Sequence, residues 1–522
     1  MSSLPPRMLF VTIVHAIFSQ YGDIMGACFN LMNVPIRRMF NESMQEQYGP
    51  LTDSSFELLF SACASSMYLG LMIGFGLMGY MMDKIGRKET AVTIRGLLGI
   101  TGSICMILSM LFGRHELFVV GHIIAGICTG LKVVLIIYVA ECSPDSKRGL
   151  TSMAINSGGV LTVMVITPLC LPAIFGNEHA WAALPFISVI MAIIHLCVAG
   201  KFPQSPKQLY MKKNDEVAAR AAILFYSGAN ADIDHSILLM DEEKDKEPEQ
   251  AASIVDILQN RKYRFSFFLV LLVAFIPVFS ALNVKSQFLI SMLMTYGLSQ
   301  SEATTAMLVI SAISLPICFI SPFLIHKFGR RPIFATVTIL CALEWVGFGF
   351  AQIFVDLHAA DLTVSWISAC LASILGQSAI NMGLLIMSPI LISEICPHHT
   401  RAAISQLTQV FPIGFAIGEV TLFPEVREMF GSFLFFFLGA TCAALAFLLF
   451  ILMGEPSANG HGERKKHKRH HHLHHSDHSS LKRDDTWTRT YGTLLDTPED
   501  TESSGESINA SDLVYKQQEK FF

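Results

Sequence analysis

Charged residues are scarce in this chain. Asp, Glu, Lys and Arg make up 15% of its 522 residues, whereas soluble proteins carry about a quarter. This shortage excludes an ordinary water-soluble domain, and the 52% of hydrophobic residues fall into long runs that indicate a membrane protein. The runs do not alternate with a period of two, which excludes a membrane β-barrel. The net charge of −5 is spread over loops and tail and indicates no nucleic-acid partner.

The chain also lacks the motifs of an enzyme. It has no nucleophile–base motif, no phosphate-binding loop and no closed metal site, so we predict neither catalysis nor a cofactor. Its twelve cysteines lie mostly inside apolar runs and indicate small apolar residues, not a disulfide framework. Eight histidines cluster in the tail between residues 461 and 478. They lack the fixed spacing of a zinc site, and weak zinc binding is an alternative to a solvated tail.

About twelve apolar runs are long enough to span a bilayer, which takes roughly 20 residues per helix. We therefore predict an all-α polytopic membrane protein with two six-helix pseudo-repeats. An N-terminal half covers residues 1–200, and a C-terminal half covers residues 265–453. Residues 201–264 form a polar central loop, in which residues 217–225 predict a short surface helix, and residues 454–522 have the composition of a disordered tail.

A short basic turn occurs once in each half. Residues 79–88 contain Asp83 and Arg87, and residues 323–331 repeat the pattern with Arg330. Basic residues concentrate in the loops that share this side, which places these loops and both termini in the cytoplasm. Asn41 begins an Asn-Glu-Ser glycosylation sequon that then falls in the first outer loop. A doubled membrane chain of this kind is typical of transporters, with the substrate site between the halves.

Further motifs follow in a characteristic order, at residues 138–149, 203–209, 253–264, 394–401 and 455–456. With the basic turns, they resemble the major facilitator superfamily and, within it, the sugar-porter (facilitative glucose transporter-like) family. The similarity covers about residues 8–456. The resemblance implies a small-molecule carrier that alternates access between the two sides of the membrane.

The same motifs imply a cytoplasmic latch, in which arginines pair with carboxylates at helix ends across the two halves. The residues assigned to this gating role are Asp83, Arg87, Glu141, Arg148, Arg330, Glu394 and Arg401. In the alternative interpretation, the loop arginines only enforce the orientation of the chain in the membrane.

The substrate path departs from the sugar porters. Their seventh helix carries a glutamine pair that binds sugar hydroxyls; here only Asn283 of that motif remains, and Asn156 stands where the fifth helix commonly has Gln. We assign substrate binding to these two asparagines, to Gln287 and to Lys285 of the seventh segment, and to Asp23 of the first. Ionisable groups are costly in a bilayer and should face a cavity or a partner.

Two lysines leave the charge of the substrate open. Lys132 and Lys285 belong to segments that line the cavity in this superfamily. They indicate an anionic substrate if both face the cavity, or else they neutralise Asp23. Proton coupling through Asp23 is the alternative to the pairing of Asp23 with a helix amide or a lysine.

We therefore predict a multi-pass carrier, placed in the plasma membrane, that moves a small polar solute by facilitated diffusion. The substrate that the resemblance implies is a sugar or polyol, and the lipid bilayer is the other partner. The alternatives are a proton-coupled or organic-anion carrier and a non-transporting sensor with the same fold. Glycine strings at residues 70–79 and 121–130 predict close helix packing.

Overall fold

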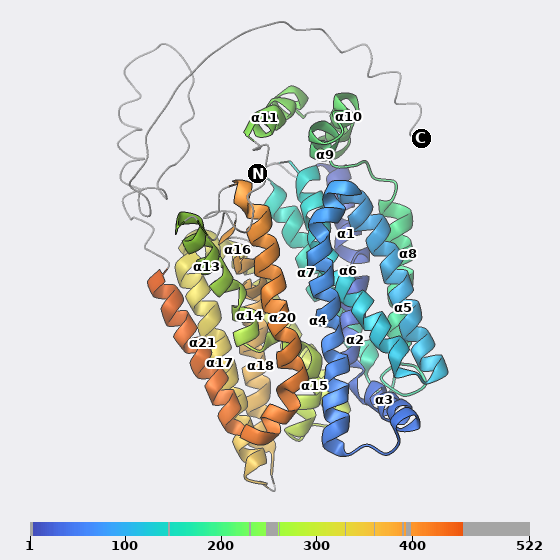
Figure 1. Ribbon diagram of the computed structural model, residues 1–522, viewed down its shortest axis with the longest axis vertical. Helices are drawn as coiled ribbons and strands as arrows, with labels where there is room; N and C mark the ends of the chain where they lie inside the picture. Colours follow the sequence, from blue (N-terminus) through green and yellow to red (C-terminus); the bar gives the residue numbers. More distant parts are fainter. Residues whose placement is uncertain are drawn as a thin grey trace, which may run out of the picture. The chain divides into compact units, whose positions relative to one another are not determined.

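The protein is described by a computed structural model. It covers residues 4–144, 147–228, 231–246, 259, 261–328, 330–359, 361–388, 391–392 and 398–452. All regular structure in these ranges is helical, as the sequence predicts (Figure 1).

The first half begins with α1 (Pro6–Phe18), α2 (Tyr21–Leu31), α3 (Asn33–Tyr48) and α4 (Asp53–Lys84). It continues with the π-helix η1 (Glu89–Ile94), α5 (Arg95–Phe112), α6 (His115–Cys142), α7 (Arg148–Ile166), the 3-10 helix η3 (Thr167–Cys170) and α8 (Ala183–Ala199). The central loop contains α9 (Pro206–Met211), α10 (Glu216–Ser227) and α11 (Ile233–Lys246). The helix predicted at residues 217–225 is α10.

The second half contains α13 (Arg261–Ala274), α14 (Ile276–Phe279), α15 (Leu282–Thr295), α16 (Gln300–Phe328) and α17 (Arg330–Asp356). It ends with α18 (Thr363–Met382), the 3-10 helix η4 (Leu384–Ile386), α20 (His398–Phe430) and α21 (Ser432–Leu452). One compact unit, Met1–Ala446, contains the predicted first half and the predicted second half as far as Ala446. The second unit, Phe447–Phe522, is described only as far as Leu452.

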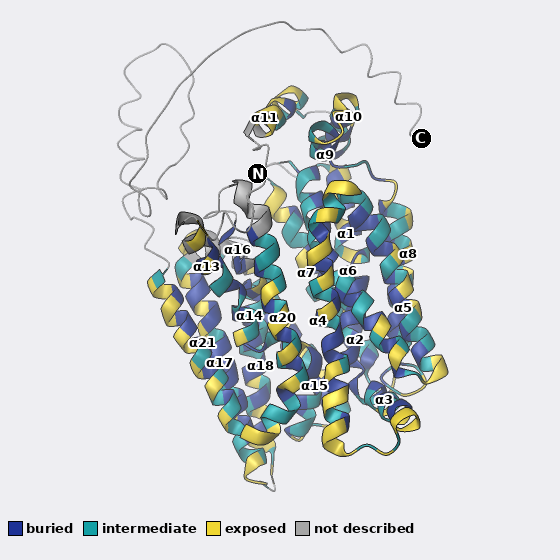
Figure 2. Cartoon of the chain, in the orientation of Figure 1, coloured by how far each residue is buried: buried dark blue, intermediate teal, exposed yellow. Residues whose placement is uncertain are grey.

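Eleven segments of the described chain are long and apolar enough to cross a membrane, and the shorter apolar helix α8 makes a twelfth. A helix satisfies all its backbone hydrogen bonds internally, which the hydrocarbon of a bilayer requires. Figure 2 shows many exposed residues along these helices. Leu111, Phe186 and Phe433 are among the large apolar side chains that are more than half exposed, as expected of groups that face lipid.

The two ends of the helix bundle carry different short helices. In Figure 1, α3 lies at one end of the bundle and α9, α10 and α11 lie at the other. We refer to these as the α3 end and the α9 end.

Three of the predicted spans are interrupted. The first breaks between α1 and α2 at Ser19 and Gln20, and the seventh breaks around Ser280 and Ala281. The tenth stops at Gly383, whose φ of 118° is reached easily only by glycine. Broken helices are typical of transporter binding sites, because they free backbone polar groups where a cavity can use them.

Glycines bring α4 and α6 into direct backbone contact. A Cβ atom on Gly70 would lie 1.9 Å from the Ile123 carbonyl oxygen, and one on Gly126 would lie 2.0 Å from the Met67 carbonyl oxygen. Gly76 and Gly79, in the same string as Gly70, have open space instead. Only part of the predicted packing string therefore packs.

Candidate substrate cavity

A cavity of about 350 Å³ lies between the halves. Its walls come from α2, α6 and α7 of the first half and from α16, α18 and η4 of the second. Hydrogen-bonding groups line it from both sides: Asn156, Ser157, Ser311, Gln377 and Asn381. Apolar side chains such as Met153, Val160 and Met307 fill the space between them. Amides and hydroxyls on an apolar wall suit a small polar solute.

The cavity reaches two of the helix breaks. Asp23 is the third residue of α2, just after the first break. Gly383 and Leu385 follow the end of α18. At the first break, the Gln20 amide donates to the carbonyl oxygens of Ala16 at 2.9 Å and Ile155 at 3.0 Å. The break is thus held by a side chain, while the cavity opens beside it.

Asp23 and Lys132 form an ion pair on the cavity wall. The Lys132 Nζ atom lies 2.5 Å from Asp23 Oδ2, and 12% and 19% of the two side chains are exposed. Gly159 of α7 lies next to the pair, since a Cβ atom there would be 3.0 Å from the Lys132 Nζ atom. Because glycine has no side chain, it does not cover the pair. Of the two alternatives left open for Lys132, the structure shows neutralisation of Asp23. The pair contributes no net charge to the cavity.

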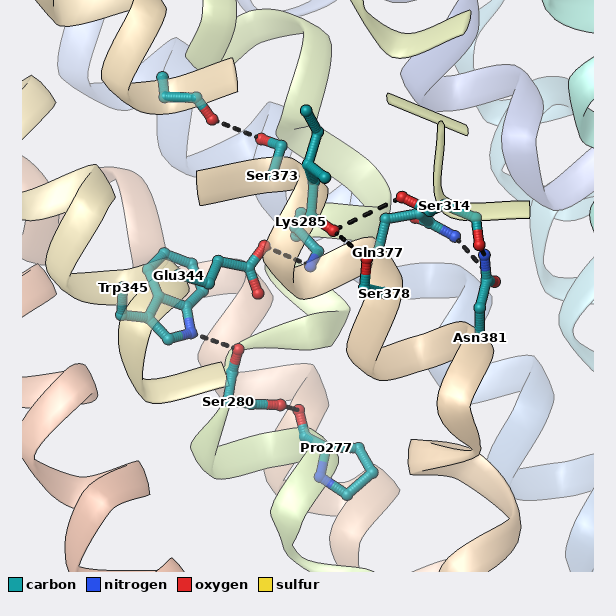
Figure 3. Close-up of polar contacts among 12 residues, drawn as sticks. Pro277, Ser280, Lys285, Ser314, Glu344, Trp345, Ser373, Gln377, Ser378 and Asn381 are labelled. Atoms are coloured by element: carbon teal, nitrogen blue, oxygen red, sulfur yellow. Dashed lines mark hydrogen bonds and ion pairs between the residues drawn. The ribbon is translucent and has the colours of Figure 1, made fainter. Parts of the chain in front are cut away.

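The amides of α18 form a short relay at the cavity. Figure 3 shows Asn381 pointing toward Ser314, to whose carbonyl oxygen its amide donates at 2.9 Å. Gln377 donates to Asn381 Oδ1 at 3.4 Å. Asn156, on the opposite wall, is exposed, and its side-chain amide has no hydrogen bond within the described chain. Asn156 and the outer atoms of Gln377 are therefore available to a solute.

The other three predicted binding residues lie on α15, outside the cavity lining. Lys285 is bound to Glu344 of α17 at 2.5 Å and is almost fully buried. Asn283 approaches Glu419 of α20 at 3.5 Å, and Gln287 donates to the Met67 sulfur at 3.5 Å. The structure thus brings Asp23 and Asn156 together at the cavity and places the α15 residues elsewhere.

Sequence reasoning did not assign Gln377, Asn381 and Ser311 to the site. Gln377 and Asn381 are four residues apart on one helix face, in the last two turns before the C-cap glycine of α18, Gly383. A pair of amides at that spacing next to a helix-ending glycine was the available signal. Within the described residues, no group of three or more His, Cys, Asp or Glu side chains is arranged to hold a metal ion.

Two of the residues assigned to the latch form an ion pair within the first half, at the α9 end. Arg87 Nε lies 3.1 Å from Glu141 Oε1, and both side chains are mostly buried. Ser205 donates to the second oxygen of Glu141 at 2.6 Å. Asp83 makes an exposed contact of 3.5 Å with Lys212, and Arg148 is the first residue of α7. Glu394 lies outside the described residues, as do the side chains of Arg330 and Arg401.

The predicted glycosylation sequon lies on α3. Asn41 accepts a hydrogen bond from Gln45 at 3.0 Å. Ser43 is buried, and its hydroxyl bonds to the His115 ring at 2.8 Å and accepts from the His115 backbone at 3.2 Å. The serine of the sequon therefore has a structural role in the folded chain.

The family model described as sugar (and other) transporter matches residues 10–461. The chain belongs to this family. A mouse protein named solute carrier family 2, facilitated glucose transporter member 7, is 24% identical over 463 residues, which cover 87% of this chain and 88% of the mouse protein. A bovine member 2 of the same family is 29% identical over 295 residues, covering 56% and 57% of the two chains.

Solved structures of sugar transporters share the fold. The xylose transporter XylE from E. coli, in a partially occluded inward-open conformation, superposes with a TM-score of 0.66 at 20% identity; the match covers 86% of this chain and 99% of XylE. XylE bound to 6-bromo-6-deoxy-D-glucose matches equally well and is described as a proton:xylose symporter. This member of the sugar transporter family is a multi-pass carrier that works by alternating access, not an enzyme.

Proposed function

We propose that the protein carries an uncharged sugar or polyol by facilitated diffusion across the plasma membrane. The observation that carries this proposal is the cavity between the halves, whose amides and hydroxyls surround a charge-neutral ion pair. Hydroxyl groups of a sugar pair well with amides, and an unpaired amide in a dry site disfavours solutes that lack such groups. The names of the related proteins, glucose transporters and a xylose transporter, support a carbohydrate.

In this proposal, the solute contacts Asn156 from the first half and Gln377 from the second. Because these residues lie on different halves, a bound solute bridges the bodies 1–200 and 265–453, which then rock about it. Asn381 positions Gln377 through the relay to Ser314. The sugar porters bind sugar hydroxyls with a glutamine pair in their seventh helix, which this chain lacks. In this proposal the amides of Asn156 and Gln377 supply those hydrogen bonds instead.

The latch closes the α9 end, which faces the cytoplasm in this proposal. Arg87 and Glu141 form its first-half part, and Arg330, Glu394 and Arg401 are proposed for the second half. Burial lowers the pKa of Lys88, which lies beside Arg87, although neighbouring Glu89 opposes the shift. The basic residues Lys84, Arg87 and Lys88 at this end support the orientation.

Uptake by proteoliposomes tests the proposal with a panel of labelled hexoses, pentoses, polyols and sugar acids. We expect saturable uptake of an uncharged member, with no dependence on a pH gradient. Gln377→Ala and Asn156→Ala should each raise KM about three- to tenfold, the equivalent of one lost hydrogen bond. Thr336→Ala, an exposed residue of α17 that bonds only within its own helix, is the matched control. Uptake of sugar acids alone would refute the neutral-substrate proposal.

A proton-coupled carrier is the second candidate, because Asp23 lies partly exposed on the cavity wall. In that case uptake depends on the pH gradient, and Asp23→Asn abolishes the dependence while leaving exchange of unlabelled for labelled solute intact. If the purified, folded protein moves no solute of the panel, the sensor interpretation takes precedence over both.

A further inference from the structure

A buried ion pair outside the cavity lining joins the broken seventh span to α17. Lys285 Nζ and Glu344 Oε1 are 2.5 Å apart, with only 6% and 1% of the side chains exposed. Figure 3 shows the two side chains meeting between their helices. Glu344 packs directly on α18, because a Cβ atom on Gly376 would lie 1.9 Å from its carboxylate carbon. The pair therefore connects three helices of the second half.

A second contact from α17 holds the break itself. The indole nitrogen of Trp345, next to Glu344, donates to the Ser280 carbonyl oxygen at 2.5 Å (Figure 3). Ala281 follows with a φ of 43°, a conformation that is strained for a residue with a side chain. Two neighbouring residues of α17 thus bind the seventh span, one on either side of its break. The break is held as a rigid bend.

The opposite side of α15 contacts the first half. Tyr68 of α4 donates to the Asn283 carbonyl oxygen at 2.9 Å, and the Ile290 backbone donates to Asn30 of α2 at 3.0 Å. Gln287 reaches Met67 from the same side. Because 3.6 residues complete a helical turn, positions 283, 287 and 290 fall on roughly the opposite face from Lys285. α15 is therefore held between its own half and the other half.

The contacts on these two faces differ in how easily they separate. Separating Lys285 from Glu344 would leave two charges without partners inside the bilayer, which is strongly unfavourable. The contacts of α15 with α2 and α4 are hydrogen bonds between uncharged groups and an edge-to-face contact of Phe29 with Phe288. Each of these contributes far less than the ion pair. When the halves move apart at the α3 end, the contacts with α2 and α4 should break first.

We propose that Lys285 and Glu344 form a clamp that makes α15 travel with the second half, so that the α3 end opens by release of α15 from α2 and α4. Lys285 is then a positioning residue of the transport cycle and not a ligand of the solute. The proposal goes beyond the choice of substrate, since it concerns only how the carrier opens.

The principal test removes the clamp without leaving an unpaired charge. In Lys285→Met/Glu344→Gln, both side chains keep nearly their length and shape. We expect Vmax to fall at least fivefold at equal amounts of protein, with KM within twofold of wild type, because neither residue lines the cavity. Ser373→Ala, on α18 with a bond only to its own helix, should leave both constants unchanged. An unchanged Vmax in the double variant, or a raised KM with normal Vmax, would overturn the proposal.

Suppression by a second change separates a clamp from a general loss of structure. Tyr68→Phe removes hydrogen bonds from α4 to α15, including that to the Ser286 hydroxyl at 2.6 Å. In the clamp-free variant it should raise Vmax at least twofold, because α15 then separates more easily from the first half. A further decrease in Vmax would contradict the clamp.

A readout without solute keeps this test independent of the proposed substrate. Asn30→Cys, in a background whose accessible native cysteines are replaced by serine, places a thiol between α2 and α15. A hydrophilic maleimide labels this thiol in purified protein only when the two helices separate, and the bond from Ile290 to Asn30 is absent from all the proteins compared. We expect the labelling rate to fall at least threefold when the clamp is removed and to recover with the charge-reversed pair Lys285→Glu/Glu344→Lys. Equal labelling with and without the clamp refutes the proposal even if the substrate assignment holds.

Discussion

The close contact between α4 and α6 gives a graded prediction within a single run of glycines. Ordinary non-bonded contacts lie at about 3.5 Å. The new Cβ atom of Gly70→Ala would lie 1.9 Å from the Ile123 carbonyl oxygen, so the two backbones have to separate by more than about 1 Å at that point. Gly126→Ala meets the Met67 carbonyl oxygen at 2.0 Å and should act in the same way.

Overpacking of this kind costs about 1–3 kcal/mol. Replacement of an uncrowded helical glycine by alanine is instead neutral or favourable by up to about 1 kcal/mol. Gly76→Ala and Gly79→Ala, which have nothing within 4 Å of the new atom, are therefore matched controls on the same helix. Gly70→Ala and Gly126→Ala should lose stability, while the two controls keep or gain it.

The assay is thermal unfolding of the detergent-purified protein, followed by the fraction that remains monodisperse after heating. Both members of the crowded pair should unfold at lower temperature than wild type, and both controls at the same or a higher temperature. Equal losses from Gly70→Ala and Gly76→Ala would refute the claim that backbone contact, rather than glycine content, joins these helices. The double variant Gly70→Ala/Gly126→Ala should lose less than the sum of its parts, because one separation relieves both contacts.

Three further outcomes follow from other contacts. Lys132→Met leaves Asp23 without its partner and should lower the free energy of unfolding by up to about 3 kcal/mol. The double variant Lys132→Met/Asp23→Asn should lose less, and equal thermal unfolding of the two variants would contradict the pairing. Arg87→Ala frees Glu141 at the α9 end and should lower Vmax severalfold without changing the order of preferred solutes; a changed order in competition assays would remove Arg87 from the latch. Ser43→Ala should cost about 1 kcal/mol through its lost bond to His115, in enzymatically deglycosylated protein as well; no loss there would show that only the sequon matters.

The fold could be predicted from the sequence because a bilayer leaves few alternatives. Apolar runs of spanning length have to be helices, and the repeated basic turn shows that they form two halves. The interruption of three spans was not predicted. The break at Gly383 has a local signal in its glycine. The breaks of the first and seventh spans are held by tertiary contacts, such as the bonds from Gln20 to the Ile155 carbonyl and from Trp345 to the Ser280 carbonyl, which no local pattern contains.

The candidate site was predicted only in part for the same reason. Asp23 and Asn156 lie at the cavity, as expected from helices that line it. Lys285 was assigned to substrate because a charge in a span needs either a cavity or a partner, and the sequence does not choose between them. Its partner, Glu344, lies 59 residues away on another helix, and only the tertiary fold of the second half brings the two side chains together.

The ion pairs Asp23–Lys132 and Lys285–Glu344 each pack against a glycine of a helix that lines the cavity. Gly159 and Gly376 provide the space for Asp23–Lys132 and for Glu344, while their neighbours on the same helices line the cavity. Substitutions at Asn156, Val160, Gln377 or Ile380 can therefore alter what the cavity accepts without changing the internal charge balance. Solute preference can thus be changed while both ion pairs stay in place, which makes these wall residues a practical target for redesigning the selectivity of the carrier.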